Sequence, residues 1–155
     1  MGEVCVVISQ PWHVAYIAER MREADRQECW AWALMTPMEA LTQGYEESDL
    51  CFTGLYDQEP VCMFGVCRDR QVIGNGGTIW LLGTPALETY QVSFLRYCQR
   101  YMPVLCEGLD RVGNYVDARN KKSIRWLKWL GFEVDPDPVP AGLFRLPFHK
   151  FEKAC

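Results

Sequence analysis

The chain has 155 residues and a mass of 17.9 kDa, which is the size of one ordinary domain. Hydrophobic residues make up 49% and charged residues 23%, a balance that excludes a disordered tail or a fibrous protein. The net charge of −4 argues against a general electrostatic affinity for nucleic acid or anionic membranes, and no apolar run reaches the ~18 residues of a membrane span. We expect one domain over residues 1–155.

The chain begins with a predicted strand and a predicted helix. Val4–Ile8 is a short continuous apolar run, which is typical of a buried strand. Pro11 suits the first turn of a helix, because its missing N–H is not needed there. We expect this helix to run to about Glu23.

Two more helix starts follow. Asp25 and Glu28 have the spacing of a capping box, with Asp in the role of the usual Ser or Thr. Thr36 and Glu39 form a clearer box, with proline at the first helical position. Gly44 is expected to end this last helix in a left-handed conformation.

The next block predicts a β-meander. Leu50–Tyr56 and Val61–Cys67 are apolar runs joined by a short polar turn, which favours a hairpin. Thr78–Leu82 is apolar throughout and is therefore expected to be a central strand. The predicted turns and loops of this block lie at 57–60, 69–71 and 74–77.

Thr84 and Pro85 predict the start of a helix of about 20 residues that ends near Cys106. Its inward stripe recurs every three or four residues: Leu87, Tyr90, Phe94, Cys98, Tyr101 and Leu105. Gly113–Ala118 is a predicted strand.

Asn120 is expected to cap the last helix, which ends at Gly131. Phe132–Val134 and Leu143–Phe151 are predicted extended segments. The predicted order is β-α-α-β-β-β-α-β-α-β-β: a mixed sheet with a helical hairpin early and two helices late. The fold class is therefore α/β, or α+β with a mixed sheet.

Eight cysteines do not predict disulfides here. Four of them, Cys5, Cys51, Cys62 and Cys67, lie in apolar strand-like runs, where cysteine behaves as a small hydrophobe. The first residues, MGEVCVVISQ, lack the features of a secretion signal. We therefore expect a reducing compartment and free thiols. Neither a Cys-x-x-Cys pair nor a zinc-like Cys/His spacing occurs, so we expect no metal site.

The element order and one motif resemble the GCN5-related N-acetyltransferase (GNAT) fold. Residues 120–134, NKKSIRWLKWLGFEV, resemble the GNAT segment in which an Asn follows the fifth strand and the next helix ends in Leu-Gly-Phe. The spacing from Asn120 to Leu130-Gly131-Phe132 fits that segment. The resemblance implies a GNAT-like acyl-CoA N-acyltransferase fold.

A second resemblance covers nearly the whole chain. The segments ECWAWALMTPMEAL, TGLYDQEPVCMFGV, NYVDARNKKSIRWLKWLGF and GLFRLPFHKF resemble a family of tailed-phage proteins that includes the small internal virion protein of short-tailed coliphages. This resemblance implies a phage or prophage origin and, for some members, a part in assembling the internal core of the particle. It implies location in the host cytoplasm or packaging in the virion. The implied partners are phage internal or core proteins, or a host protein.

The GNAT resemblance implies acetyl-CoA or coenzyme A as cofactor, if there is one. Such enzymes hold the pyrophosphate on backbone N–H groups at a helix start and polarise the thioester carbonyl with an N–H of the central strand. The positions implied to contact the coenzyme are Trp80, Leu81, Leu82, Gly83, Thr84, Asn120 and Ser123.

Several of these positions have a plainer alternative. The phosphate loop departs from the family pattern, because only Gly83 resembles it and Pro85 removes a donor; the segment may equally be a capped helix start. Trp80 can be core, and Asn120 a plain N-cap. The last third of the chain, 111–155, holds 9 Lys/Arg against 5 Asp/Glu, which would suit an anionic ligand or be ordinary surface.

The catalytic residues are not identified by the sequence. The family often places its proton-donating Tyr where this chain has Leu127, and residues 76–83 hold no carboxylate. Asp117 and Tyr115 are weak candidates, and Asp117 may instead pair with Arg119. The other candidates for the acceptor side each have a structural alternative: Glu28 and Glu39 as capping residues, His13 and His149 as surface residues.

Two functions therefore remain open. One is a degenerate GNAT domain with a structural or assembly role in a phage, for which Trp30, Trp32, Trp126 and Trp129 would offer a partner surface rather than only core. The other is an active acetyl-CoA-dependent N-acetyltransferase acting on an amine of a protein or small molecule. The shortened loop and missing Tyr favour the first; the Asn120 segment supports the second.

Overall fold

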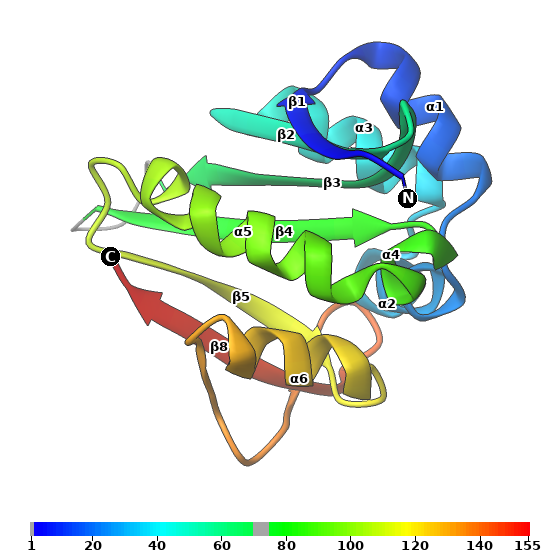
Figure 1. The fold of residues 1–155 in the computed structure, drawn as a ribbon. Coiled ribbons are helices and arrows are strands. Elements are labelled where there is room, and N and C mark those ends of the chain that lie inside the picture. The colour runs from blue at the N-terminus through cyan, green and yellow to red at the C-terminus, as the bar shows by residue number, and fades with distance from the viewer. Residues whose placement is uncertain (1, 70–74) are drawn as a thin grey trace.

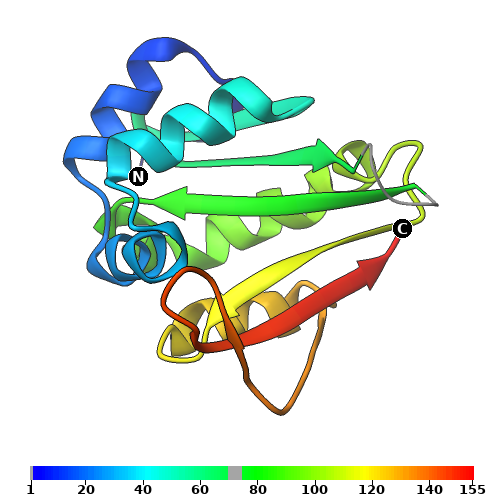
Figure 2. The same ribbon diagram turned by 180° about the vertical axis from the view of Figure 1, so that it is seen from behind.

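The computed structural model describes residues 2–69 and 75–155, so parts of the turn predicted at 69–71 and of the loop predicted at 74–77 lie outside the described residues. The predicted loop is wrong at Gly76 and Gly77, which begin the strand Gly76–Gly83. The described chain forms one mixed sheet with helices on both faces. Figure 1 shows α5 and α6 in front of the sheet, and Figure 2, from behind, shows the three N-terminal helices on the opposite face. Among the described residues no helix is long and apolar enough to cross a bilayer.

The strands follow the order β1-β2-β3-β4-β5-β8-β6 across the sheet, and β7 pairs with β8. All neighbours are antiparallel except β4 and β5, which run parallel. The strands are β1 (Val4–Ile8), β2 (Leu50–Tyr56), β3 (Glu59–Arg68), β4 (Gly76–Gly83), β5 (Arg111–Asp117), β6 (Glu133–Val134), β7 (Val139–Ala141) and β8 (Leu146–Ala154).

Three helices, one more than the predicted order has, separate β1 from β2, and the predicted long helix is divided at Tyr90. The helices are α1 (Pro11–Glu19), α2 (Glu23–Ala33), α3 (Pro37–Glu47), α4 (Pro85–Thr89), α5 (Gln91–Leu105) and α6 (Lys121–Trp129). The predicted capping box at Thr36 and the predicted cap at Asn120 are both confirmed, since each side-chain oxygen accepts a backbone N–H of the first turn.

Three helix boundaries were predicted wrongly. The first helix, α1, ends at Glu19 and not near Glu23. Asp25 does not cap α2; it lies inside the first turn with its buried carboxylate facing the sheet, and Arg22 is the N-cap. Gly44 does not end α3, which continues to Glu47. Its role is packing, because a Cβ there would lie 2.7 Å from Cζ2 of Trp80.

The sheet opens between its two parallel strands. β4 and β5 pair only at Gly76–Arg111, Gly77–Val112 and Thr78–Gly113, and beyond these pairs the strands diverge. At the point of divergence Asn114 Nδ2 donates a hydrogen bond to the carbonyl of Ile79 at 3.0 Å. The asparagine thus satisfies a backbone acceptor that a continuing ladder would otherwise use.

The main core lies between the sheet and α5 and α6, with Phe94, Met102 and Val112 among its buried residues. A second core joins α1 and α3 to the other face around Ile17 and Met63. Each helix layer is therefore anchored on its own side of the sheet, and the opening between β4 and β5 runs between them.

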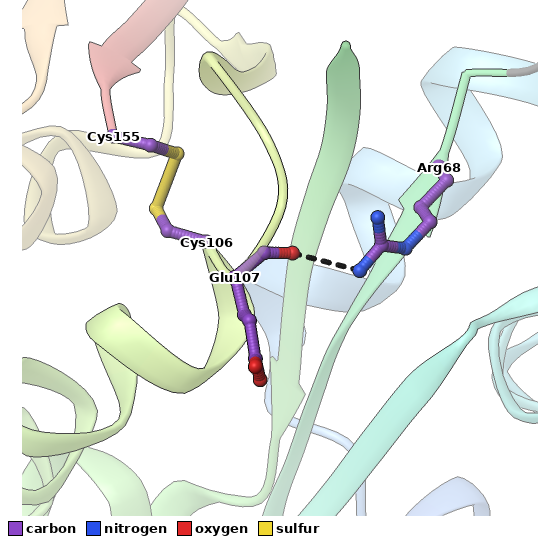
Figure 3. Close-up of a disulfide and its surroundings, with 4 residues drawn as sticks. All are labelled: Arg68, Cys106, Glu107 and Cys155. Atoms are coloured by element: carbon purple, nitrogen blue, oxygen red, sulfur yellow. Dashed lines mark hydrogen bonds between the residues drawn. A yellow bond between two sulfur atoms is a disulfide. The ribbon is translucent and has the colours of Figure 1, made fainter.

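Cys106 and Cys155 form a disulfide, so the expectation of eight free thiols is wrong for this pair (Figure 3). β8 runs antiparallel to β5, which brings Ala154 opposite Arg111, and Cys155 N–H donates to the carbonyl of Asp110 at 2.9 Å. The strand pairing thus brings Cys155 to Cys106 at the end of α5. A spacing of 49 residues carries no sign of this contact. The other six cysteines are free.

Candidate functional site

A cavity of about 330 Å³ follows the opening between β4 and β5. One side is formed by α2 and α3, with Glu28, Trp32 and Gly44 among the lining residues. The other side is formed by α6, through Ser123 and Trp126. The cavity therefore has walls from both helix layers, joined where the sheet is open. Its volume lies at the lower end of the range for small-molecule sites.

The predicted strand residues Trp80, Leu81 and Leu82 all line this cavity. Trp80 Nε1 donates to Ser48 Oγ at 2.7 Å, and its ring lies against Gly44, which fixes the indole at the wall. Trp80 is therefore not a core residue alone. It is partly buried and packs against the smaller core while facing the cavity.

The loop residues that the resemblance implies for phosphate binding are already hydrogen-bonded within the chain. Gly83 N–H donates to Asp25 Oδ2 at 2.9 Å, and the Gly83 carbonyl accepts Arg22 N–H at 2.9 Å. Thr84 uses both its N–H (2.8 Å) and its hydroxyl (3.1 Å) on the carbonyl of Val61. The buried Thr84 thus holds the loop to β3 rather than facing outward.

Arg22 reaches the other implied coenzyme residues. Its Nη2 donates to Ser123 Oγ, and to Asn120 Oδ1 at 3.5 Å. Asn120 Oδ1 also accepts Ser123 N–H at 3.4 Å as the cap of α6. The buried Nδ2 of Asn120 has no hydrogen-bond partner within residues 2–69 and 75–155. Asn120 therefore caps α6 as predicted. The ligand-facing contact that the resemblance implies for Asn120 and Ser123 is made here by Arg22.

Arg22 is the centre of a charge cluster that is buried at Arg22 and Asp25 and reaches solvent at Glu88 and Lys122. Its Nε lies 2.9 Å from Asp25 Oδ2, its Nη1 lies 3.1 Å from Glu88 Oε1, and its guanidinium lies over the ring of Trp126. Lys122 Nζ contacts the second oxygen of Glu88 at 3.1 Å. We call Arg22, Asp25, Glu88 and Lys122 the Arg22 cluster. It joins α2, α4 and α6 at the end of β4.

Each charge in the Arg22 cluster is balanced by a partner. Burial lowers the pKa of Arg22, but Asp25 and Glu88 outweigh it and raise that pKa, so the guanidinium stays charged. Burial raises the pKa of Asp25, and Arg22 and the Gly83 N–H oppose that rise. Burial raises the pKa of Glu88, but Lys122 and Arg22 outweigh that effect and lower the pKa. Two carboxylates therefore stand beside the donors where a pyrophosphate would be expected.

Sequence reasoning selected neither Arg22 nor Glu88, and it explained Asp25 as a cap. Apart from Asp25, the partners of Arg22 lie 66 to 101 residues away in the chain, so only the assembled fold brings them together.

Glu28 is a half-buried acid of the cavity wall. Its Oε1 accepts the N–H of Asp117 at 2.6 Å, and the predicted capping role is wrong because Arg22 is the N-cap of α2. Burial raises the pKa of Glu28 to about 8, and the negative charges of Asp25 and Asp117 act in the same direction. The Asp117 N–H and Arg22 oppose the rise. At neutral pH the side chain is mainly a neutral carboxylic acid.

The two weak catalytic candidates take different positions. Asp117 is buried and its carboxylate pairs with Arg119, with the shortest N–O distance 2.8 Å, which is the predicted structural alternative. Tyr115 lines the cavity and stacks on Trp32, with ring centroids 5.4 Å apart. Of the residues considered for catalysis, Tyr115 and Glu28 line this cavity and Asp117 does not.

Other predicted residues lie away from the cavity. Glu39 is confirmed as a capping residue. His13 is buried, against the surface position expected, and its Nδ1 accepts the N–H of Gln10 at 3.0 Å. His149 contacts the carbonyl of Asp135 at 2.7 Å. Within the described parts of the chain, no group of three or more His, Cys, Asp or Glu is placed to hold a metal ion.

The tryptophans do not form one surface. Trp126 is buried and its Nε1 donates to Gln91 Oε1 at 3.0 Å, which joins α6 to α5. Trp129 and Trp30 are half-exposed, and Trp30 stacks on Phe144 with centroids 4.5 Å apart. The prediction of a partner surface therefore applies to Trp30 and Trp129 but not to Trp126.

No family model and no curated protein matches the sequence. Solved structures do match over nearly the whole chain. A putative acetyltransferase from Salmonella typhimurium, solved with acetyl-CoA, aligns with a TM-score of 0.72 and 13% identity over 98% of this chain and 94% of that one. Spermidine N-acetyltransferase from Vibrio cholerae, with CoA and spermine, aligns at 0.68 and 10% identity over 97% and 95%.

The aminoglycoside acetyltransferase AAC(6')-Ib in complex with coenzyme A gives a TM-score of 0.68 and 15% identity over 98% of this chain and 95% of that one. The predicted fold is thus confirmed: the chain has the mixed α/β fold of the GNAT acetyltransferases. At the end of β4, Gly83 N–H is bonded to Asp25, and Ser123 Oγ and Asn120 Oδ1 to Arg22, whereas Nδ2 of Asn120 has no partner among the described residues.

Proposed function

We propose that residues 1–155 form a single GNAT-like domain that has lost acetyl transfer and serves a structural or assembly role in a phage particle. The observation that carries the first half is the Arg22 cluster. A mutually neutralised ion network, buried at Arg22 and Asp25, binds the Gly83 N–H that a coenzyme would need. Displacing it would leave Asp25 buried without its counter-ion, which is costly.

The assembly role is supported by the sequence resemblance to phage internal virion proteins and by exposed apolar residues. Trp30, Leu34, Leu143 and Phe144 are all at least 41% exposed, and Leu143 N–H is bonded to the carbonyl of Trp32, which holds the 142–144 loop to α2. Exposed apolar residues that gather in one place favour protein contacts. The partners we propose are phage internal or core proteins or a host protein, in the host cytoplasm or the virion.

Calorimetric titration with acetyl-CoA and with coenzyme A tests the loss of the coenzyme site. We expect no heat and no change of melting temperature at millimolar coenzyme. Micromolar binding would overturn the proposal. Mass spectrometry of purified particles, from a phage that encodes this chain, tests the assembly role. If the chain is absent from the particles, the assembly role is overturned, whatever the titration shows.

An active N-acetyltransferase remains a second candidate, and Glu28 favours it. A carboxyl group with a pKa of about 8 in a cavity is suited to take a proton from an amine once it is ionised, at about pH 8 and above. If this candidate holds, Glu28→Gln should reduce turnover at least a hundredfold while the chain stays folded. Glu46→Gln, at an exposed position on α3, is the matched control.

A further inference from the structure

One edge of the sheet is β1 (Figure 1), which pairs with β2 on one side and with no strand of the described chain on the other. The backbones of Glu3, just before the strand, and of Ser9, just after it, both bond toward the β2 side. The N–H and C=O groups of successive residues alternate between the two sides of an antiparallel strand. Val4, Val6 and Ile8 therefore turn these groups away from β2, toward the open edge.

The chain itself closes this outward row at both ends. At the start of β1 the carbonyl of Val4 accepts the hydroxyl of Tyr97 at 3.1 Å. Beyond the end of β1, Gln10 is still extended and is the next outward residue. Its N–H donates to Nδ1 of His13 at 3.0 Å, and its carbonyl accepts the His13 N–H at 3.0 Å. The open part of the edge is therefore the short stretch between these two closures.

The open stretch is complementary to itself. Within residues 2–69 and 75–155 the N–H and C=O groups of Val6 and Ile8 have no hydrogen-bond partner. A second copy laid antiparallel, with Val7 opposite Val7, brings Val6 of each copy opposite Ile8 of the other. Each of these two residue pairs exchanges both N–H···O bonds, so four hydrogen bonds form and every open group of the edge is satisfied.

The side chains suit the same pairing. Ile8 is 74% exposed although it is apolar, and Val6 is half-buried on the sheet face that carries α5. In the antiparallel pair these two β-branched side chains lie side by side across the contact, an arrangement that stabilises sheets. Proteins commonly protect an open edge with a charged residue or a proline. Val4–Ile8 contains neither.

Charge complementarity also favours a second copy as the occupant. The same register places Glu3 across from Pro11 of the second copy, the first residue of its α1. Glu3 is exposed, and by strand alternation it lies on the face opposite α5, where Figure 2 shows the N-terminal helices. The first turn of α1 has no acidic residue of its own. Each copy would thus bring a carboxylate to the positive end of the other's helix.

We propose that the edge of β1 is a self-association surface, through which two copies of this chain pair antiparallel about Val7 into a two-fold dimer with one continuous sheet. The same patch serves both copies, so the contact uses up both edges and assembly stops at the dimer. The proposal goes beyond the function proposed above, since it requires neither a coenzyme nor a phage partner.

Sedimentation velocity of the purified chain tests the association. Measurements from about 1 μM to about 1 mM cover the range in which small interfaces dissociate. We expect a reversible equilibrium between monomer and dimer, with no larger species. A chain that stays monomeric up to about 1 mM, or one that grows beyond the dimer, would overturn the proposal.

Amide hydrogen exchange tests whether the dimer uses this edge. In the monomer the N–H groups of Val6 and Ile8 face solvent, so they should exchange fast and be slowed about tenfold once about 90% of the chain is dimeric. The N–H groups of Cys5 and Val7 bond to β2 and should be protected at every concentration. A dimer in which Val6 and Ile8 still exchange fast would assign the contact to another surface.

Ile8→Lys places a charge at the edge and leaves the bonds to β2 in place, because this side chain is exposed and its N–H faces outward. It should weaken the dimer at least about tenfold while the circular dichroism spectrum stays that of the wild type. Val139→Lys is the matched control, since Val139 is 43% exposed on β7, toward the opposite end of the sheet. It should dimerise like the wild type. A dimer of unchanged strength in Ile8→Lys, or equal weakening in both variants, would contradict the proposed contact.

Discussion

Asp25 accepts the backbone N–H of Gly83 across 58 residues of chain, and the same carboxylate oxygen lies 2.9 Å from Nε of Arg22. One oxygen thus serves the end of β4 and the start of α2 together. In the GNAT fold this end of the central strand is where resemblance led us to expect a ligand. Here a side chain of the protein itself supplies the negative charge.

Removal of Arg22 should destabilise the protein strongly. In Arg22→Ala the carboxylate of Asp25 would be left buried without its counter-ion, so we expect the free energy of unfolding to fall by about 3–5 kcal/mol. Arg20→Ala breaks an exposed pair with Glu19 and should cost at most about 1 kcal/mol. Urea denaturation of both variants measures the difference. Equal losses would show that the Arg22 cluster is not the buried network described.

Substitution of Gly83 should also weaken folding. A Cβ there would lie 2.7 Å from Leu87 Cδ2 and 3.2 Å from the carbonyl of Val61, so Gly83→Ala must move α4 or β3 and should cost about 1–3 kcal/mol. Gly76→Ala, in the same strand, meets nothing closer than 3.3 Å and should be nearly neutral. Thermal melts of the two variants compare them; a Gly83→Ala protein as stable as wild type would contradict the packing.

The raised pKa of Glu28 makes stability depend on pH in a definite direction. The folded state binds this proton up to about pH 8, whereas an unfolded Glu releases it near 4.5, so stability falls as pH rises between these values. The slope from this one group is at most about 1.4 kcal/mol per pH unit. Denaturation from pH 4.5 to 8 should therefore show a steeper decline in wild type than in Glu28→Gln. Parallel curves would speak against the buried acid.

Reduction of the disulfide should lower stability. Cys106–Cys155 closes a loop with a sequence separation of 49, for which we expect a loss of about 2–4 kcal/mol on reduction. The double variant Cys106→Ser with Cys155→Ser should have the lower stability from the outset and give no response to reductant. A melting temperature that reductant still shifts in this variant would assign the effect to another pair of cysteines.

Local signals predicted the parts of the fold that depend on a few neighbouring residues. The Thr36 box, the Asn120 cap and the hairpin of β2 and β3 each follow from residues within one turn or one pair of strands. Gly44 was misjudged because a glycine after a helical stretch looks like a C-cap, whereas its cause is the indole of Trp80 36 residues later. The same limit applies to the disulfide, which depends on the pairing of β5 with β8.

Sequence reasoning located part of the cavity wall but did not predict the charged groups beside it. Trp80, Leu81, Leu82 and Ser123 do line the cavity, since their positions follow from element order. Glu28 was a candidate for the acceptor side with capping as its structural alternative, because its capping-box spacing explains it locally. Its raised pKa comes from burial, from Asp25 on its own helix and from Asp117 on β5, and the burial and the contact with β5 are encoded by no spacing in the sequence.

The parting of β4 from β5 has a consequence for how such proteins diverge. Here the gap is bordered by Asn114 at its closed end and by the Arg22 cluster at the end of β4, both within the chain. The border contacts are all side-chain contacts, whereas the three paired positions of β4 and β5 are held by the backbone. Substitutions at the borders would therefore alter what the gap holds and leave the backbone pairing of the two strands in place.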